Sequence, residues 1–273
     1  MIKAKEKETA APFLRWAGSK RKLLPAISSL LPTTFDRYVE PFAGSACLYF
    51  HLLPNDALLG DINEELINTY LQVKARPASV ISSLEKMSDL TSESFYRIRA
   101  QNPESLGRVA RAARFIYLNR LCFNGLYRTN MKGEFNVPFG GGRTGEMPSA
   151  DKIRAVAKAF KKSEFFSGPF EEVLARVKQG DFVYLDPPYS ISNRRVFNNY
   201  SNDIFGIKNL QRLRKELARL DKKGIPFLLS YGLSKEGIEL AKGFRTQHAV
   251  VQRQISGFSA HRRVARELLV TNY

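Results

Sequence analysis

Four consecutive residues, Asp186, Pro187, Pro188 and Tyr189, directly follow an apolar stretch, Phe182 to Leu185, that is typical of a short buried strand. The prolines stiffen the loop and remove backbone donors, which leaves the Asp186 carboxylate and a carbonyl as acceptors beside the Tyr189 ring. Such a group suits a flat, neutral ligand with an amino group, because the amine donates while the ring stacks. A nucleobase fits. The structural alternative is a Pro-Pro turn with an incidental acid and tyrosine.

Two further motifs follow predicted strands. EPFAGSA comes after Arg37–Val39, and GDIN comes after Ala57–Leu59. A turn of small residues lets the backbone approach a ligand, and an acid after the next strand can accept hydrogen bonds from a ribose. Asp61 lies 17 positions after Gly44, close to the spacing of the dinucleotide-binding fingerprint. The turn is not a GxGxxG sequence, however, and a helix cap is an equal alternative for Asp61.

Several other chemistries are not supported by the sequence. AGSKRK lacks the two-glycine spacing of a phosphate-binding loop. His51, His248 and His261 fit no metal-ligand spacing, and there is no nucleophile elbow for a serine hydrolase. Cys47 and Cys122 are too few for a disulfide framework or a thiolate metal site. We therefore expect no metal, and a reducing, cytoplasmic compartment.

The composition favours a folded protein with a polyanionic partner. The 273 residues are 44% hydrophobic, which is enough for a full core, and 43 Lys plus Arg against 26 Asp plus Glu give a net charge of +17. Nucleic acid is the commonest polyanion, and a solvated basic surface is the alternative. The charged N-terminus lacks a signal-peptide core and no apolar stretch is long enough to cross a bilayer, so a membrane role is not expected.

The periodicity predicts strands alternating with helices, and hence a doubly wound, mostly parallel α/β sheet. Val173 and Val177 are predicted to share one helix, and a leucine stripe from Leu210 to Leu220 predicts another that ends at Gly224. Residues 125–148 are rich in glycine and predict a loop or hairpin on a helical insertion. The predicted strands are Arg37–Val39, Ala57–Leu59, Phe165–Phe166, Phe182–Leu185, Phe227–Leu229, His248–Val251 and Leu268–Val270.

Five strings in this order, FLRWAGSK, EPFAGSA, GDIN, NGLYRTNMKGEFNVPFG and DPPY, resemble the motifs of Dam-type (α-class, D12) DNA adenine N6-methyltransferases. The resemblance runs from about Phe13 to the C-terminus. It implies a seven-stranded, Rossmann-like methyltransferase fold that uses S-adenosylmethionine (SAM) and releases S-adenosylhomocysteine, with no metal. It further implies a catalytic SAM-binding domain at 1–64 and 150–273, and a helical target-recognition insertion at 65–149.

The resemblance also implies roles for individual residues. Asp186 matches the catalytic acid, which in the family also lies against the methionine part of the cofactor, and Asp61 matches the acid that holds the ribose hydroxyls. The catalytic residues implied are Asp186, Pro187, Pro188 and Tyr189. The cofactor-binding residues implied are Trp16, Gly18, Lys20, Phe42, Gly44, Asp61 and Asp186.

In the insertion, the resemblance implies a set of DNA contacts. Arg128 is the candidate to read a guanine edge, since its guanidinium can pair with O6 and N7, and a phosphate clamp is the alternative. Phe123 resembles the aromatic that enters the base stack, with a core phenylalanine as the alternative. The residues implied are Arg15, Phe123, Asn124, Leu126, Arg128 and Pro138. Arg194 and Arg195, just after DPPY, are candidates to bind phosphates or to be surface charges.

Two departures from the family pattern affect these expectations. Ala46 replaces the usual second glycine of the cofactor turn, a change that we expect the space around its Cβ to accommodate. GGRTGEMP follows Gly140, where close relatives carry a more basic and aromatic segment, so the outer bases of the DNA site stay open. We expect GATC, before other adenine-containing sites, to be the DNA sequence that is recognised.

The sequence thus predicts an enzyme that flips an adenine from double-stranded DNA and methylates its N6. The open alternatives are a catalytically silent DNA-binding protein on the same fold, and an enzyme that methylates RNA adenine or a protein side-chain amide. A monomer is favoured. A cognate restriction nuclease, as in a restriction-modification system, is an open question as a partner.

Overall fold

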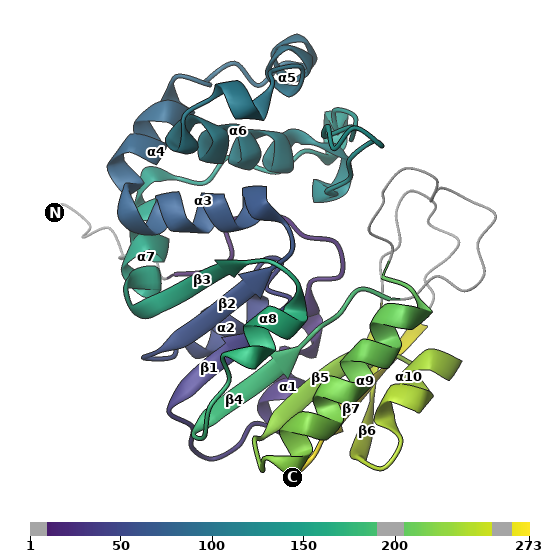
Figure 1. Cartoon of the computed structure of the whole chain (residues 1–273). Coiled ribbons are helices and arrows are strands. Elements are labelled where there is room, and N and C mark those ends of the chain that lie inside the picture. Colours follow the sequence, from purple (N-terminus) through teal and green to yellow (C-terminus); the bar gives the residue numbers. More distant parts are fainter. Residues whose placement is uncertain (1–9, 190–204, 253–263) are drawn as a thin grey trace, which may run out of the picture.

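A seven-stranded sheet with helices on both faces forms the centre of the protein (Figure 1). The computed structural model describes residues 10–189, 205–252 and 264–273, so the candidates Arg194 and Arg195 lie outside the described residues. The strand order is β3-β2-β1-β4-β5-β7-β6, with β1 to β5 parallel and β7 antiparallel to both of its neighbours. The seven predicted strands and the mostly parallel doubly wound sheet are confirmed. The strands are β1 (Arg37–Glu40), β2 (Ala57–Asp61), β3 (Ser163–Ser167), β4 (Asp181–Leu185), β5 (Phe227–Gly232), β6 (Arg245–Gln252) and β7 (Val264–Thr271).

Ten α-helices lie in the described part of the chain, and they pack on the sheet or on one another. They are α1 (Leu24–Ser28), α2 (Cys47–Leu52), α3 (Glu64–Ala75), α4 (Pro77–Glu85), α5 (Ser92–Arg99), α6 (Arg108–Leu121), α7 (Ala150–Ala159), α8 (Phe170–Ala175), α9 (Ile207–Lys222) and α10 (Lys235–Ala241). Within this described part, none of them is both long and apolar enough to cross a lipid bilayer.

Alternation along the strands divides the core into two layers. In β4, Phe182 and Tyr184 belong to the cluster formed with α1, α2, α3 and α7, whereas Val183 and Leu185 belong to the cluster formed with α8, α9 and α10. Both faces are apolar because neighbouring side chains of a strand point to opposite faces and each face is covered by helices. This sandwich fixes the strand ends, where the three motifs are found.

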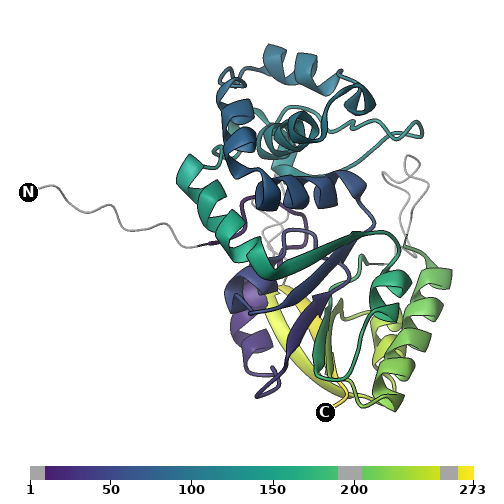
Figure 2. The same ribbon diagram turned by 60° about the vertical axis from the view of Figure 1, so that its left-hand side comes forward.

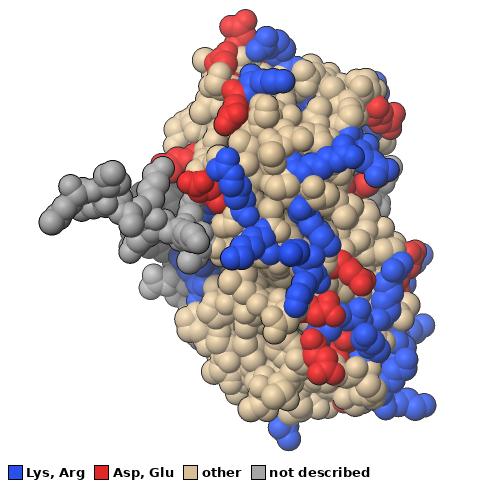
Figure 3. All heavy atoms as spheres, turned by 90° about the vertical axis from the view of Figure 1, so that its left-hand side faces the viewer, with Lys and Arg blue, Asp and Glu red and all other residues tan. Residues whose placement is uncertain are grey.

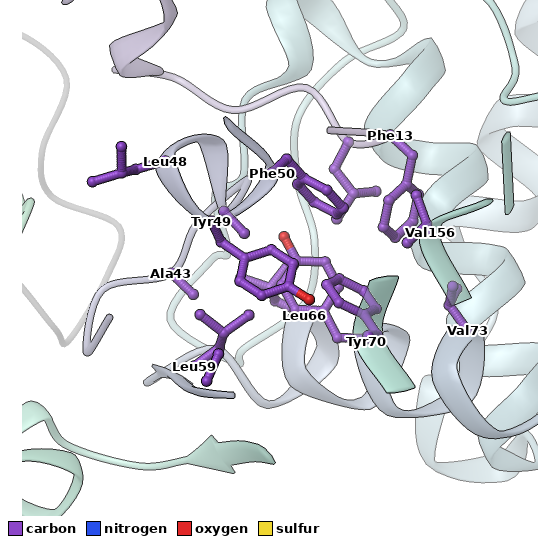
Figure 4. Packing of buried hydrophobic residues seen from close by; sticks show 14 of the residues in the cluster. Phe13, Ala43, Leu48, Tyr49, Phe50, Leu59, Leu66, Tyr70, Val73 and Val156 are labelled. Atoms are coloured by element: carbon purple, nitrogen blue, oxygen red, sulfur yellow. The ribbon is translucent and has the colours of Figure 1, made fainter. Parts of the chain in front are cut away.

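The first core layer also anchors the N-terminal segment. Tyr49 and Tyr70 lie at its centre, and Phe13 packs beside Tyr70 with ring centroids 5.8 Å apart (Figure 4). The Tyr49 hydroxyl donates to the carbonyl of Ala159 at 2.7 Å, which ties α2 to the end of α7. Because Phe13 is fully buried, the residues that follow it are held close to the sheet edge.

The helices α4, α5 and α6 extend beyond α3, away from the sheet (Figures 1 and 2). After α6 the chain forms a hairpin-like loop, with bridges between Cys122 and Phe139 and between Thr129 and Phe135. Helix α3 packs its apolar face in the first core layer, so the proposed boundary at residue 65 falls at the start of a shared helix. The insertion has a small core of its own, formed by Phe95, Ile98, Tyr117, Leu118, Leu121, Cys122 and Val137.

The prediction that Val173 and Val177 share one helix is wrong. Helix α8 ends at Ala175, and Val177 is buried in the connection that follows. The chain has to turn at once into β4, and Gly180 adopts φ +87° there, in the left-handed region that favours glycine. Helix α9 ends at Lys222, shortly before Gly224, as its leucine stripe predicted.

A buried ion pair joins the starts of the two central strands. Arg37 donates from Nε and Nη2 to the two carboxylate oxygens of Asp181, at 3.0 and 2.8 Å, and Asp181 is fully buried. The backbone N–H of Lys178 donates to the same carboxylate at 2.8 Å. The pair therefore locks β1 to β4 at the end of the sheet opposite to the motifs.

Basic side chains gather on one face of the protein. Figure 3 shows Lys and Arg across the middle of the face that lies to the left in Figure 1, where α7 is found. The exposed basic residues of α7 and the turn after it are Arg154, Lys158, Lys161 and Lys162.

Candidate active site

The motifs predicted to carry chemistry meet at one edge of the sheet. Strand β1 lies between β2 and β4, and the order of the strands reverses between β1 and β4. In open α/β sheets, ligands bind outside the carboxyl ends of the strands at such a reversal, because the loops leave in opposite directions. EPFAGSA leaves β1, GDIN leaves β2 and DPPY leaves β4, so all three lie around this point.

Asp186 is held by two groups that bind the same oxygen. The Lys20 ammonium lies 2.7 Å from Oδ1, and the Ser230 hydroxyl donates to Oδ1 at 3.1 Å. Among the described residues, Oδ2 takes part in no hydrogen bond, and the side chain is 21% exposed. Burial raises the pKa of Asp186, while Lys20 and the Ser230 hydrogen bond oppose that rise. One carboxylate oxygen is thus fixed in place and the other is available to a ligand.

Tyr189 is fixed by its hydroxyl. It donates to the carboxylate of Glu267, whose oxygens lie at 2.7 and 2.8 Å, and it accepts from Lys20 Nζ at 3.1 Å. Its ring meets Tyr231 edge-on, with centroids 5.2 Å apart. Burial raises the pKa of Tyr189 to about 12, so the hydroxyl stays protonated at neutral pH. Burial alone would lower the pKa of Lys20, but its anionic neighbours outweigh this and raise it.

Asp61 joins the ends of β1 and β2. Its Oδ2 accepts from the backbone N–H of Gly44 at 3.0 Å, and its Oδ1 accepts from that of Asn63 at 2.9 Å. Burial raises the pKa of Asp61, and these backbone donors oppose the rise. The cap of α3 is Asn63, which accepts from Leu66 N–H at 3.1 Å, so the helix-cap alternative for Asp61 is wrong. Each carboxylate oxygen keeps a lone pair that can accept from a ligand.

The turn after β1 needs glycine at position 44. Gly44 has φ +46°, and a Cβ there would lie 2.8 Å from two ring atoms of Trp16. Trp16 stacks on Tyr127, with centroids 6.3 Å apart and planes 14° apart. The N-terminal segment therefore lies directly on the turn after β1. In this segment Gly18 adopts φ +86°, two residues before Lys20.

Phe42, another predicted cofactor contact, packs on the other face of the sheet. Its ring lies 5.2 Å from Phe170 and 5.8 Å from Phe205, between centroids.

Beside Asp61, the apolar side chain of Ile62 is 63% exposed at the end of β2. An exposed large apolar residue at this edge is a surface on which a flat ring can pack.

Three polar residues of the site were not predicted from the sequence. Glu267 and Ser230 bind Tyr189 and Asp186, and Glu40, at the end of β1, accepts from the Tyr38 hydroxyl at 2.9 Å. Burial raises the pKa of Glu40 well above its usual range, and the Tyr38 hydrogen bond opposes this. The signal that could have found Glu267 and Glu40 is an acid directly beside buried apolar residues in a strand, since buried acids are rare without a partner.

The candidate Arg15, in the N-terminal segment, contacts backbone carbonyls of the insertion. Its Nη1 donates to the carbonyl of Arg143 at 2.8 Å and lies 3.4 Å from those of Arg120 and Cys122. Phe123 is half-buried, and the Arg143 guanidinium lies 5.0 Å from its ring centroid. Arg15 thus connects the N-terminal segment to the loop after α6.

Arg128 is oriented by its neighbour across the hairpin. Its Nε donates to Asn136 Oδ1 at 2.7 Å and its Nη2 to the Asn136 carbonyl at 3.4 Å. Its Nη1 makes none of the hydrogen bonds found among the described residues. Leu126 is 37% exposed, and the carbonyl of exposed Pro138 accepts from Phe123 N–H at 2.9 Å. Asn124 has φ +56°, so the loop turns sharply at this point.

The described residues contain no group of three or more His, Cys, Asp or Glu that could hold a metal ion. The site instead combines an aromatic ring, a partly available carboxylate and a glycine turn. These are features of a site for organic ligands.

Comparisons with known proteins all find similarity to DNA methyltransferases. A family model described as D12 class N6 adenine-specific DNA methyltransferase matches residues 16–256. A Type II methyltransferase of Lactococcus lactis subsp. cremoris is 35% identical, covering 98% of each chain, and one of Methanocaldococcus jannaschii is 34% identical, covering 96% of this chain and 99% of its own. A DNA adenine methylase of Haemophilus influenzae is 32% identical, covering 94% of this chain and 92% of its own.

Proposed function

Because this chain belongs to the D12 class of N6 adenine-specific DNA methyltransferases, we propose that it transfers the methyl group of SAM to N6 of an adenine in double-stranded DNA. In this proposal the enzyme first flips the adenine out of a short duplex site, and GATC is the first site to test. The observation that carries the proposal is the Asp186 carboxylate, in which Lys20 and Ser230 hold Oδ1 and Oδ2 takes part in no hydrogen bond among the described residues. An amino group is the ligand that such an oxygen accepts from.

The residues at the sheet edge fit SAM. Gly44 lets the Trp16 ring pack on the turn after β1, Asp61 keeps acceptor capacity for two ribose hydroxyls, and Ile62 offers an exposed apolar surface for a purine. When bound, SAM supplies an electrophilic methyl group on a positively charged sulfur. Asp186, at the end of the neighbouring strand, is an anion suited to lie near that charge.

The chemistry left to the protein is to orient a poor nucleophile. The lone pair of adenine N6 is delocalised into the ring, so the amine needs acceptors that turn it toward the methyl group. We assign this role to Asp186 Oδ2 and the carbonyl of Pro187, which also stabilise the positive charge that grows on nitrogen. Turning the base out of the duplex costs a few kcal/mol. Tyr189 offsets part of this cost by stacking.

Replacing Tyr189 with alanine is expected to lower the single-turnover rate by roughly 5- to 150-fold, since a base stacked on an aromatic ring is worth about 1–3 kcal/mol. Tyr189→Phe keeps the ring and is expected to lose less. The rate is measured with saturating SAM and a duplex oligonucleotide. Equal losses in the two variants would argue against stacking.

For Arg128, we propose that Nη1 and the remaining N–H of Nη2 donate to a guanine edge, because Asn136 already orients the guanidinium. Arg128→Ala is expected to cost about 1–3 kcal/mol at the guanine position alone, which relaxes specificity there. Kinetics on oligonucleotides with one substituted base pair measure this. A uniform loss on every sequence, with a weaker salt dependence, would instead identify a phosphate contact.

Expression in a host without adenine methylation, followed by mapping of N6-methyladenine along its DNA, tests the proposed function. One modified motif supports transfer and gives the site, and GATC supports the guanine contact of Arg128. Folded protein that binds SAM but leaves DNA unmodified would overturn the proposal and favour RNA. A cognate nuclease stays a proposed partner, since two relatives are named Type II methyltransferases. A monomer acting on cytoplasmic DNA is proposed as well.

A further inference from the structure

Glu267 is a carboxylate that is buried in the sheet. It lies in β7 opposite Gly232 of β5 and is 1% exposed, next to the buried Leu268 and Leu269. A buried carboxylate is costly unless it is paired and hydrogen-bonded. Its partner here is the hydroxyl of Tyr189, 78 positions away in the chain, which donates to it at 2.7 Å.

The direction of each hydrogen bond at the Tyr189 hydroxyl follows from the groups around it. An ammonium has only donors and a carboxylate only acceptors, so the hydroxyl accepts from Lys20 and donates to Glu267. Lys20 Nζ lies 2.7 Å from Asp186 Oδ1 and 4.0 Å from Glu267 Oε2. The same ammonium therefore connects the Tyr189 hydroxyl to the catalytic carboxylate.

The ring of Tyr189 is also restricted along its length. Tyr231 meets it edge-on, and a Cβ built on Gly232 would lie 3.7 Å from its Cε1 and Cζ, so the ring lies against the end of β5. These contacts limit where the ring lies, and the two hydrogen bonds hold its far end. Because the Tyr189 ring already has a fixed orientation before the base binds, less side-chain entropy is lost when the base stacks on it.

We propose that Glu267 is a positioning residue, which accepts from the Tyr189 hydroxyl and holds that ring in the plane on which the extruded adenine stacks. The proposal rests on the proposed function of Tyr189. In this role Glu267 acts through the Tyr189 hydroxyl, and Lys20 Nζ, 4.0 Å from its Oε2, is a further neighbour. Glu267→Ala changes neither partner of the ion pair between Lys20 and Asp186, which are 2.7 Å apart in the wild-type protein, and removes no residue of the apolar core clusters, so we expect the variants to fold.

A double-mutant cycle between Glu267→Ala and Tyr189→Phe tests the proposal. In the wild-type background, Glu267→Ala is expected to lower the single-turnover methyl-transfer rate about threefold to tenfold, as for loss of a typical hydrogen bond. In the Tyr189→Phe background, which has no hydroxyl, the same substitution is expected to lower the rate less than about twofold, because coupled residues are not additive. Equal losses in both backgrounds would overturn the proposal.

A conservative variant separates positioning from folding. Glu267→Gln keeps an acceptor for the hydroxyl and is expected to recover most of the rate lost in Glu267→Ala. Thermal unfolding of all variants shows whether stability changes alike in both backgrounds. Glu239→Gln, an exposed carboxylate on α10, is the control for loss of one charge and is expected to behave as wild type. A Glu267→Gln variant as slow as the alanine variant, with unchanged stability, would contradict the proposal.

A fluorescent readout distinguishes failure of this proposal from failure of the proposed function. A duplex with 2-aminopurine at the target adenine reports stacking of the extruded base by its emission. If Tyr189→Ala leaves the signal unchanged, the stacking role of Tyr189 itself is wrong. If Tyr189→Ala changes it but Glu267→Ala does not, only the positioning role of Glu267 is overturned.

Discussion

Replacing Asp186 with alanine is expected to lower methyl transfer by about a thousandfold, to the edge of detection, which is the upper end of the range for removing one preorganised electrostatic group. Lys20 and Ser230 hold Oδ1 of this carboxylate, and in the proposed function Oδ2 is the acceptor for adenine N6. Without it, neither the orientation of the N6 lone pair nor the growing positive charge is supported. Single-turnover transfer of labelled methyl to a duplex measures the loss.

Binding measurements make this result specific. SAM and duplex DNA are expected to be retained by Asp186→Ala, or weakened far less than the rate, because Asp61, Gly44 and the insertion are unchanged. Asp186→Asn, which keeps the shape of the side chain and removes its charge, is the matched variant. Turnover close to that of wild type in either variant would rule out Asp186 as the catalytic acid.

The rate of the wild-type enzyme should also depend on pH in a defined direction. Burial raises the pKa of Asp186, and only the deprotonated carboxylate accepts from N6, so activity is lost as pH falls through this raised value. The acid limb should therefore lie at higher pH than for an ordinary aspartate. Lys20→Met removes a charge that opposes the rise, so it should move the limb higher still.

The second large effect is expected in stability and not in chemistry. Asp181→Ala removes one partner of a fully buried ion pair and leaves the Arg37 guanidinium without it, which typically costs about 3–5 kcal/mol of unfolding free energy. Chemical denaturation followed by circular dichroism measures the loss. The pair lies at the starts of β1 and β4, so residual folded protein should keep its affinity for SAM.

An exposed ion pair provides the control. Asp151 and Arg154 lie 2.9 Å apart on the surface of α7. Asp151→Ala is expected to cost less than about 1 kcal/mol, because water solvates both groups when the pair is broken. Similar losses in the two variants would mean that the buried pair contributes no more than a surface pair, against the structural interpretation.

Ala46 shows what a departure from a family motif means in three dimensions. The sequence suggested only that a Cβ had to be accommodated, and Ala46 is indeed fully buried before α2. Its backbone, however, adopts φ +52° and ψ +43°, the left-handed conformation, in which an alanine is less stable than a glycine by roughly 1–2 kcal/mol. This loss of stability comes from the backbone conformation, which a comparison of motifs does not show.

By itself, the sequence determined most of the elements and the edge of the sheet at which the three motifs meet. Apolar stretches such as Phe182–Leu185 indicate strands because burial on both faces requires apolar side chains at every position. Motifs that follow such strands must lie at their carboxyl ends, and parallel strands place these ends together. Val177 was assigned wrongly for a local reason, since helical spacing continued after the chain had turned toward β4.

The tertiary structure alone decided which side chains meet. Lys20 and Tyr189 are 169 positions apart, yet the ammonium donates to the phenol at 3.1 Å, and Glu267 reaches the same hydroxyl from β7. Whether Asp61 caps the helix that follows it was likewise settled by hydrogen bonds, since Asn63 is the cap of α3. Periodicity reports burial along one element, whereas these contacts depend on strand order and register between elements, and those are fixed only when the whole sheet packs.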